Sequence, residues 1–362
     1  MSKAILIFPA GMPRALSFLE QCLRDGSKVI GASSLAHDPS RPSYPEWQYL
    51  PYISDAGFDQ ALARAIQEQD IGSIYTANPV VWDHLQQHLG QIAPGVKLLN
   101  EAPANEELTR FRAAKKRAHE LLGHRLPLQD AAAKPGLSIA QLTSLLLHTD
   151  AIPGMCDHQK VHALYEVARH SPSGDLVEIG SWWGKSAFVL LRLAQCFNIG
   201  HVLCVDPWSD EHLVQQDASA IVDKVSKQVS ADEAFDVFLG NLLPYARADI
   251  NYLRMPSTAG AIEYGTQKSV QTEAFGETRY QGQIALLHID GNHSFDNASA
   301  DILAWSKYVV SGGWIVIDDY TWPFGDGPRR AADAYLAHHH AEIDTAFFMG
   351  GALFIQKKVQ HA

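Results

Sequence analysis

One short segment, residues 176–186 (LVEIGSWWGKS), constrains the fold more than any other part of the chain. It reads as an apolar strand that carries an acid, followed by a glycine turn and an amphipathic helix. In an open α/β sheet such a unit makes room for a nucleotide-like ligand at the carboxyl edge of the strands. Gly180 and Gly184 let the backbone approach that ligand where a Cβ atom would collide with it.

Acids also follow later predicted strands of the same half. Asp206 follows the apolar run 201–205, Asp290 follows 284–289, and the pair Asp318–Asp319 follows 314–317. The glycine turn therefore does not stand alone. The last strands of this C-terminal half differ from its earlier, parallel ones. Residues 345–348 and 352–356 flank Met349-Gly350-Gly351, a pattern that predicts a β-hairpin. A parallel sheet that finishes in an antiparallel hairpin is unlike an ordinary nicotinamide-binding Rossmann domain.

The N-terminal part predicts a second α/β sheet. Helical patterns separate its β-rich runs, which are residues 4–8, 28–32, 72–76 and 96–100. This alternation predicts a parallel, doubly wound sheet. Residues 124–137 carry two prolines and an alanine run without a clear period, which is typical of a linker, and short helices are predicted over 138–148 and 157–170. We predict a Rossmann-like accessory domain over 1–125, a linker over 126–152 and a second domain over 153–362.

Charge and cysteine usage exclude several classes of function. A net charge of -11 argues against nucleic acid or an anionic membrane surface as a partner, because both need clustered cations. The N-terminus lacks the apolar region of a signal peptide, and the sequence has no apolar run of about 18 residues. The four cysteines form no C-x-x-C pair, which fits a reducing compartment. We therefore expect a cytoplasmic protein; whether it forms a homo-oligomer stays open.

Several separated blocks of the C-terminal half occur in the order found in one enzyme family. They are VEIGSWWGKSA from Val177, VDPWS from Val205, FDVFLGNL from Phe235, HIDGNHSF from His288, DILAWSKYVVSGG from Asp301 and WIVIDDY from Trp314. The half resembles class I S-adenosylmethionine-dependent methyltransferases, within them the small-molecule and sugar O-methyltransferases related to macrolide and aminocoumarin tailoring enzymes. The resemblance implies methyl transfer from S-adenosyl-L-methionine to a small-molecule hydroxyl.

The resemblance also implies where the donor binds. It places the Glu178 carboxylate at the amine of the methionine moiety, with Gly180 and Gly184 shaping the turn and Ser186 opening the helix. The carboxylate of Asp206 can accept both ribose hydroxyls, although an Asp-Pro turn opener is the alternative.

Two further residues are candidates for the adenine side. Trp208 follows Asp206 closely, but aromatic packing is its alternative role. Ser257 follows the predicted strand 250–254, and a helix cap is its alternative. His288 lies within a strand and is expected to be a hydrogen-bonded core residue.

The same resemblance makes the strands before Asp290 and Asp318 adjacent, so that Asp290, Asp318 and Asp319 would converge. Carboxylates that close repel one another, and a hard divalent cation such as Mg²⁺ relieves the repulsion. A bound cation also makes a hydroxyl easier to deprotonate. The alternative is that Asp318 or Asp319 caps the following loop.

His293, in the D-G-N-H segment, is a candidate general base for the acceptor hydroxyl. Its alternative role is to position the substrate. Family members often carry a second acid where this chain has Asn292, which argues against an acid as the base here.

Three other functions stay open: a metal-independent methyltransferase, a nicotinamide-dependent oxidoreductase with tandem Rossmann domains, and a binding module that has lost catalysis. The absence of G-x-G-x-x-G argues against the second. The segments ILIFPAGMPR from Ile5 and IYTANP from Ile74 resemble the pre-ATP-grasp domain of ligases, yet no ATP-grasp catalytic domain follows them.

Overall fold

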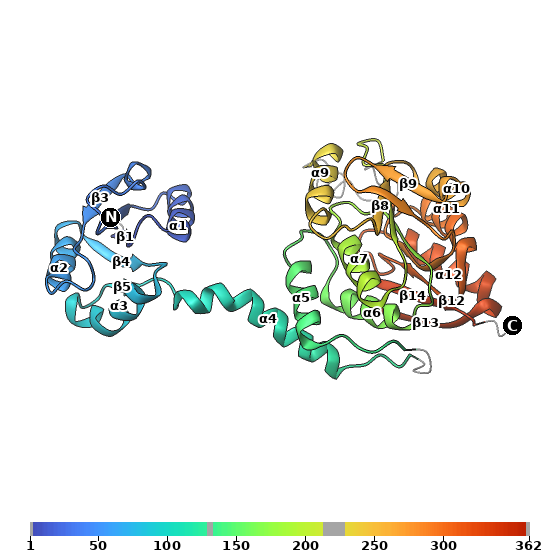
Figure 1. Ribbon diagram of the computed structural model, residues 1–362, viewed down its shortest axis with the longest axis horizontal. Coiled ribbons are helices and arrows are strands. Elements are labelled where there is room, and N and C mark those ends of the chain that lie inside the picture. Colours follow the sequence, from blue (N-terminus) through green and yellow to red (C-terminus); the bar gives the residue numbers. More distant parts are fainter. Residues whose placement is uncertain (1–2, 129–132, 213–228, 360–362) are drawn as a thin grey trace. The chain divides into compact units, whose positions relative to one another are not determined.

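The computed structural model describes residues 3–128, 133–212 and 229–359. Its internal contacts divide the chain into two units, Met1–Arg112 and Ala113–Ala362. Each unit is built around one main sheet with helices on both of its faces (Figure 1). The α/β class predicted from the sequence is confirmed.

The first unit holds a parallel sheet of five strands in the order β3-β2-β1-β4-β5. The strands are β1 (Ala4–Ile7), β2 (Val29–Ser33), β3 (Glu46–Tyr49), β4 (Ile71–Tyr75) and β5 (Lys97–Leu98). Helix α1 (Pro13–Arg24) packs in one apolar cluster, and α2 (Phe58–Glu68) and α3 (Pro79–Ile92) pack in another. Asn78 caps α3, since its side chain accepts hydrogen bonds from the amides of Val80 and Val81.

The second unit holds a sheet of seven strands in the order β13-β14-β12-β11-β6-β7-β8. The strands are β6 (Asp175–Ile179), β7 (Val202–Val205), β8 (Ile250–Leu253), β11 (Ile284–Ile289), β12 (Val309–Ile317), β13 (Ile343–Met349) and β14 (Ala352–Lys357). The last two form the predicted hairpin, and β14 also pairs antiparallel with β12. Gly350 and Gly351, with φ of +59° and +80°, make its tight turn. A small separate hairpin consists of β9 (Ser269–Thr272) and β10 (Gly276–Arg279).

Two apolar clusters cover the two faces of this sheet. One includes side chains of α5 (Ile139–Thr149), α6 (His158–His170), α7 (Lys185–Phe197) and α9 (Ala231–Leu242). The other includes side chains of α10 (Ser257–Thr266), α11 (Phe295–Trp305) and α12 (Gly327–His339). Helix α6 is unusual because every residue from Lys160 to His170 is buried.

The division by contacts differs from the predicted domain limits. Helix α4 (Pro103–Gly123) crosses the boundary between Arg112 and Ala113 as one continuous helix. Its later residues Ala114, Ala118 and Leu121 belong to the core of the second unit. Helix α5 lies inside the predicted linker, begins with a capping box between Ser138 and Gln141, and packs in the same core. Residues 129–132 of that linker lie outside the described residues.

Within the part of the chain that the structure describes, no helix is both long and apolar enough to cross a membrane.

Candidate active site

The turn after β6 and the turn after β11 meet at the point where the strand order reverses. Strand β6 pairs with β7 on one side and with β11 on the other. Gly180 has φ of +79°, and a Cβ atom added there would lie 2.0 Å from the carbonyl oxygen of Asp290. Glycine is therefore required by the approach of two protein backbones, in addition to any approach of a ligand. A reversal of this kind is the usual ligand crevice of an open α/β sheet.

Asp206 holds the turn between β6 and α7 in place. Its Oδ2 atom accepts hydrogen bonds from the amides of Ser181 (2.9 Å) and Trp182 (3.0 Å). Its Oδ1 atom accepts one from the amide of Trp208 at 2.8 Å. Trp182 takes a left-handed φ of +45°, so the carboxylate stabilises a turn that the chain alone would disfavour. The half-buried Asp206 thus lies at the predicted donor edge.

The two candidates for adenine differ in accessibility. Trp208 is 1% exposed, its indole N–H donates to the carbonyl of Trp182, and it packs against Phe235 and Phe238. It is a core residue, and we leave it out of the proposed donor site. Ser257 is half-buried at the start of α10, and its hydroxyl oxygen accepts a hydrogen bond from the indole of Trp305 at 2.9 Å.

A chain of buried polar groups begins at Glu178. Glu178 is 0% exposed: Oε2 accepts from the Ser181 hydroxyl at 2.6 Å, and Oε1 lies 3.1 Å from Nδ1 of His288. The other ring nitrogen of His288, Nε2, lies 3.6 Å from Oδ2 of Asp318. The Lys160 ammonium donates to the same Asp318 oxygen and to the Met155 carbonyl. Glu178 therefore contacts protein groups where the sequence predicts a contact with the donor amine, and the core role expected of His288 is confirmed.

The acids of this network stabilise the charged forms of its His288 and Lys160 side chains. Burial alone would lower the pKa of His288, but the neighbouring carboxylates of Asp318 and Glu178 outweigh burial and raise that pKa to about 10. Burial also opposes the charge of Lys160, yet Asp318 and Asp290 raise the pKa of the ammonium above its ordinary value. Burial and the neighbouring Asp318 raise the pKa of Asp290 well above the usual range. Without the two cations, the buried acids would carry an unfavourable charge.

The predicted acid triad divides into two groups that share Asp290. The buried group joins Asp290 and Asp318 with His288, while the half-buried group joins Asp290 and Asp319 with His293. In each group the possible ligand atoms lie within 4.8 Å of one another. Strands β11 and β12 are adjacent, as predicted, but the consecutive acids Asp318 and Asp319 have different partners.

His293 forms the best-defined polar contact on the accessible side of the site. Its Nε2 atom lies 2.7 Å from Oδ2 of Asp319, and its ring lies 4.2 Å from the ring of Trp322. Asp319 takes a left-handed φ of +54°, an uncommon conformation outside glycine that often occurs at functional sites. The pair thus has the geometry of a base oriented by a carboxylate.

Asp301, on α11, yields a prediction that concerns stability. It is 7% exposed, and burial raises its pKa to about 6 although the Ser257 hydroxyl hydrogen-bonds to it. A raised carboxyl pKa favours folding at low pH, and that benefit is lost as pH rises through about 6. Asparagine does not titrate, so the stability of Asp301→Asn relative to wild type should increase with pH. The increase between about pH 4 and pH 8 should be on the order of 2 kcal/mol. Urea unfolding at both pH values checks this, with the exposed Asp296→Asn on the same helix as control; an equal difference at both values would contradict it.

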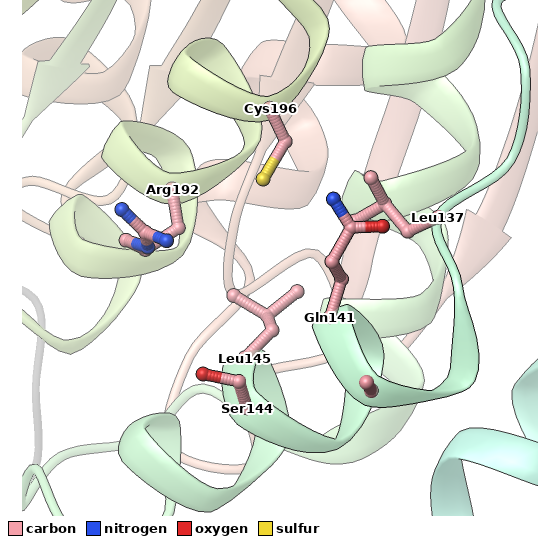
Figure 2. Close-up of a pocket in the computed structure, with 7 residues that line it drawn as sticks. Leu137, Gln141, Ser144, Leu145, Arg192 and Cys196 are labelled. Carbon is pink, nitrogen blue, oxygen red and sulfur yellow. The ribbon is translucent and has the colours of Figure 1, made fainter.

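A pocket of about 270 Å³ lies elsewhere, between α5 and α7 (Figure 2). Its lining includes Gln141, Ser144, Arg192 and Cys196, and none of the predicted site residues. Gln141 and Ser144 are exposed on α5, and Arg192 and Cys196 are half-buried on α7. It is separate from the strand-end site.

Residues 177–320 match a family model described as a methyltransferase domain. The second unit contains a methyltransferase domain. The expected resemblance of this half of the chain to S-adenosylmethionine-dependent methyltransferases is thereby confirmed at the level of a methyltransferase domain. The matched residues run from β6 to the residue after the Asp318–Asp319 pair, so they include the turns that hold Gly180, Asp206 and Asp290.

The chain with this methyltransferase domain is also similar to solved structures of low identity. One is the O-methyltransferase NovP, with 18% identity over 57% of this chain and 82% of that chain, and a TM-score of 0.40. A second is CalS11, a TDP-rhamnose 3'-O-methyltransferase of calicheamicin biosynthesis (15% identity, 71% and 96% coverage, TM-score 0.35). A third is the MycE methyltransferase of the mycinamycin pathway in complex with Mg and SAH (16% identity, 52% and 46% coverage, TM-score 0.29).

Lys160 and Ser181 are the residues of the methyltransferase site that sequence reasoning missed. Ser181 follows the glycine of the turn, where a small residue reads as part of the turn itself. Lys160 lies in a predicted helix far from the strand ends in sequence. Its only signal is a lysine in a helix whose following residues, Val161 to Leu164, are mostly apolar.

Proposed function

We propose that the methyltransferase domain transfers the methyl group of S-adenosylmethionine to the hydroxyl of a small molecule, with Mg²⁺ bound at the acid edge. The observation that carries the proposal is the His293–Asp319 pair, with 2.7 Å between Nε2 and Oδ2, beside Asp290. Asp290 is in turn in backbone contact with the glycine turn that we assign to the donor. A base, an acid pair and a donor turn thus meet at one strand edge.

The donor side fits a nucleoside with a methionine tail. The turn after β6 brings backbone to the edge, Asp206 is half-buried there, and Ser257 opens α10 after β8. When bound, S-adenosylmethionine supplies an electrophilic methyl group on its sulfonium. We propose that Gly180, Gly184 and Asp206 bind it, with Ser257 on the adenine side. Glu178 and Ser186, which are both buried, would stabilise the turn between β6 and α7 from the protein side.

His293 would take the proton of the acceptor hydroxyl. A hydroxyl is a poor nucleophile until it loses its proton, and a positioned imidazole is the usual base for that step. Asp319 orients the ring and stabilises the imidazolium that results. Trp322 packs against the ring of His293 and restricts its rotation. The indole also adds an apolar surface beside the base, against which an acceptor can pack.

The half-buried acids offer the donor set that Mg²⁺ prefers. Asp290 and Asp319 present carboxylate oxygens within the 4.8 Å group, and Mg²⁺ in proteins is usually held by one or two carboxylates together with waters and substrate oxygens. A bound cation would supply a positive charge that favours the deprotonated acceptor. Asp318 is the third ligand predicted from the sequence, and it lies in the buried group with His288.

Removal of divalent cations tests the metal part of the proposal. With tritiated S-adenosylmethionine and a panel of hydroxylated glycosides, activity after EDTA treatment should fall at least about 10-fold and return with Mg²⁺. Mg²⁺-independent activity at the full rate would instead favour the metal-independent alternative. Ca²⁺ serves as a control for non-specific charge screening, because it tolerates other geometries.

Calorimetric titration with S-adenosylhomocysteine and with NAD tests the donor part. We expect S-adenosylhomocysteine to bind at the C-terminal unit and NAD not to bind, because the sequence lacks the G-x-G-x-x-G fingerprint of dinucleotide sites. Binding of NAD alone would overturn the assignment. Donor binding with no product from any acceptor would favour a binding module.

We also propose that residues 1–125 contain an accessory domain and that the domain 153–362 carries the activity. The segment 126–152 between them includes α5, which packs in the core of the second unit. The cytoplasm is the location that we propose, because the four cysteine thiols, Cys22, Cys156, Cys196 and Cys204, form no disulfide.

A further inference from the structure

We infer that Lys160 is a built-in cation of the acid edge. Its ammonium takes the place of a metal ion beside the buried Asp318, so that a divalent cation is confined to the carboxylates of Asp290 and Asp319 in the half-buried group. The inference deepens the proposed metal-assisted function and rests on it for the location of the bound cation. Lys160 is a positioning residue, because it acts through Asp318 rather than on a reactant.

Lys160 and Asp318 form a buried ion pair. Both residues are 4% exposed, and the ammonium donates a hydrogen bond to Oδ2 of Asp318. A buried carboxylate needs a cation and hydrogen bonds to offset its loss of hydration. Lys160 meets that need from inside the protein, at the place where a metal-dependent site would use an ion. The ammonium donates a second hydrogen bond to the Met155 carbonyl, 3.2 Å from Nζ.

The backbone of Lys160 is fixed from two sides. Its amide donates to Oδ1 of Asp157, the residue that caps α6, at 2.8 Å. The hairpin turn between β13 and β14 packs against it, since a Cβ atom added to Gly350 would lie 2.4 Å from the Lys160 nitrogen. The helix cap and the hairpin turn thus fix the backbone from which the Lys160 side chain reaches the Asp318 carboxylate. The ammonium is part of the fold rather than a mobile surface group.

Asp318 has few sites left for a metal ion. Oδ2 faces both the Lys160 ammonium and Nε2 of His288, and Oδ1 accepts a hydrogen bond from the amide of Asp319 at 2.9 Å. Asp319 has a different environment, since it is half-buried and pairs with His293. The same two acids that the sequence presents as one pair therefore have separate tasks. Asp318 binds the internal cation, and Asp319 faces the accessible group.

Metal-binding measurements on the full-length protein test this division without an acceptor. Mn²⁺ binding followed by electron paramagnetic resonance, and Mg²⁺ binding by calorimetry, are compared for wild type, Asp318→Asn and Asp319→Asn. We expect Asp319→Asn to weaken affinity by roughly 10- to 100-fold, as loss of a metal-site group does, and Asp318→Asn to change it less than about threefold. Equal losses in both variants would overturn the inference.

Lys160→Gln provides the opposite test. It frees the Asp318 carboxylate, so Mn²⁺ should bind more tightly or at a second site, and Lys160→Arg should behave like wild type because it keeps the charge. Unchanged affinity and stoichiometry in a folded Lys160→Gln protein would contradict the inference.

A thermal unfolding cycle keeps the inference testable if Lys160→Gln folds poorly or if wild type binds no cation. The double variant Lys160→Gln/Asp318→Asn removes both charges, and its melting temperature should lie above that of Lys160→Gln alone. A double variant no more stable than the single one would overturn the role of Lys160. Absence of Mn²⁺ and Mg²⁺ binding in wild type, with the cycle as expected, would instead refute only the proposed metal dependence and the confinement of an ion.

Discussion

Replacing His293 with alanine is expected to lower kcat for methyl transfer by about 10²- to 10⁴-fold, the usual contribution of a general base. The imidazole is the one group of the half-buried cluster that can take a proton while a carboxylate, Asp319, stabilises the resulting charge at 2.7 Å. Steady-state kinetics at saturating donor measures the effect. Affinity for S-adenosylhomocysteine should change little, because the ring of His293 faces Asp319 and Trp322, which we assign to the acceptor side.

His338→Ala is the matched control for this experiment. His338 is exposed on α12, and its Nδ1 atom lies 2.7 Å from the carbonyl of Ala334 on its own helix. Its removal should leave kcat unchanged. If excess Mg²⁺ restored the activity of His293→Ala, the histidine would act as a metal ligand and not as the base. Activity within about threefold of wild type would exclude it from proton transfer altogether.

Gly180→Ala should unfold or severely destabilise the methyltransferase domain, by about 3 kcal/mol or more. The new Cβ atom would lie 2.0 Å from the Asp290 carbonyl oxygen, a contact that forces the two turns apart. A residue other than glycine at φ of +79° adds a further cost of about 1 kcal/mol. Urea unfolding measures the stability, and calorimetry with S-adenosylhomocysteine measures the expected loss of donor affinity in whatever protein remains folded.

Gly240→Ala controls for the effect of a methyl group added to the same unit. Gly240 lies within α9, and a Cβ atom there would meet no described atom within 4 Å apart from the neighbouring backbone of its own helix. Alanine favours helices over glycine by about 1 kcal/mol, so this variant should be as stable as wild type or more so. A Gly180→Ala protein as stable as Gly240→Ala would show that the two turns can separate freely.

The strands of both sheets could be predicted where they are buried, because their apolar runs stand out. The edge strand β3 (EWQY) and the hairpin of β9 and β10 escaped prediction since their residues are largely polar and half-exposed. The division of the long helix α4 between two units also escaped prediction. That division depends on which of its turns pack in a core, and three small or apolar residues in one helix do not reveal it.

The acids of the site could be predicted because they end strands, and parallel strands bring their ends to one edge. The partners of those acids could not. Asp318 and Asp319 are chemically identical neighbours, and what separates them is Lys160, which reaches the site from α6. Trp208 likewise follows an acid as a ligand-stacking residue would, yet the rings of α9 pack around it and bury it.

The close approach of Gly180 to Asp290 has a thermodynamic consequence. Each turn can move only if the other moves, so a ligand that orders one turn changes the free energy of binding at its neighbour. Such linkage is reciprocal: the factor by which a cation tightens binding of S-adenosylhomocysteine must equal the factor by which S-adenosylhomocysteine tightens binding of the cation. With the proposed donor at one turn and the proposed cation at the other, the close approach at this glycine would couple the two binding events.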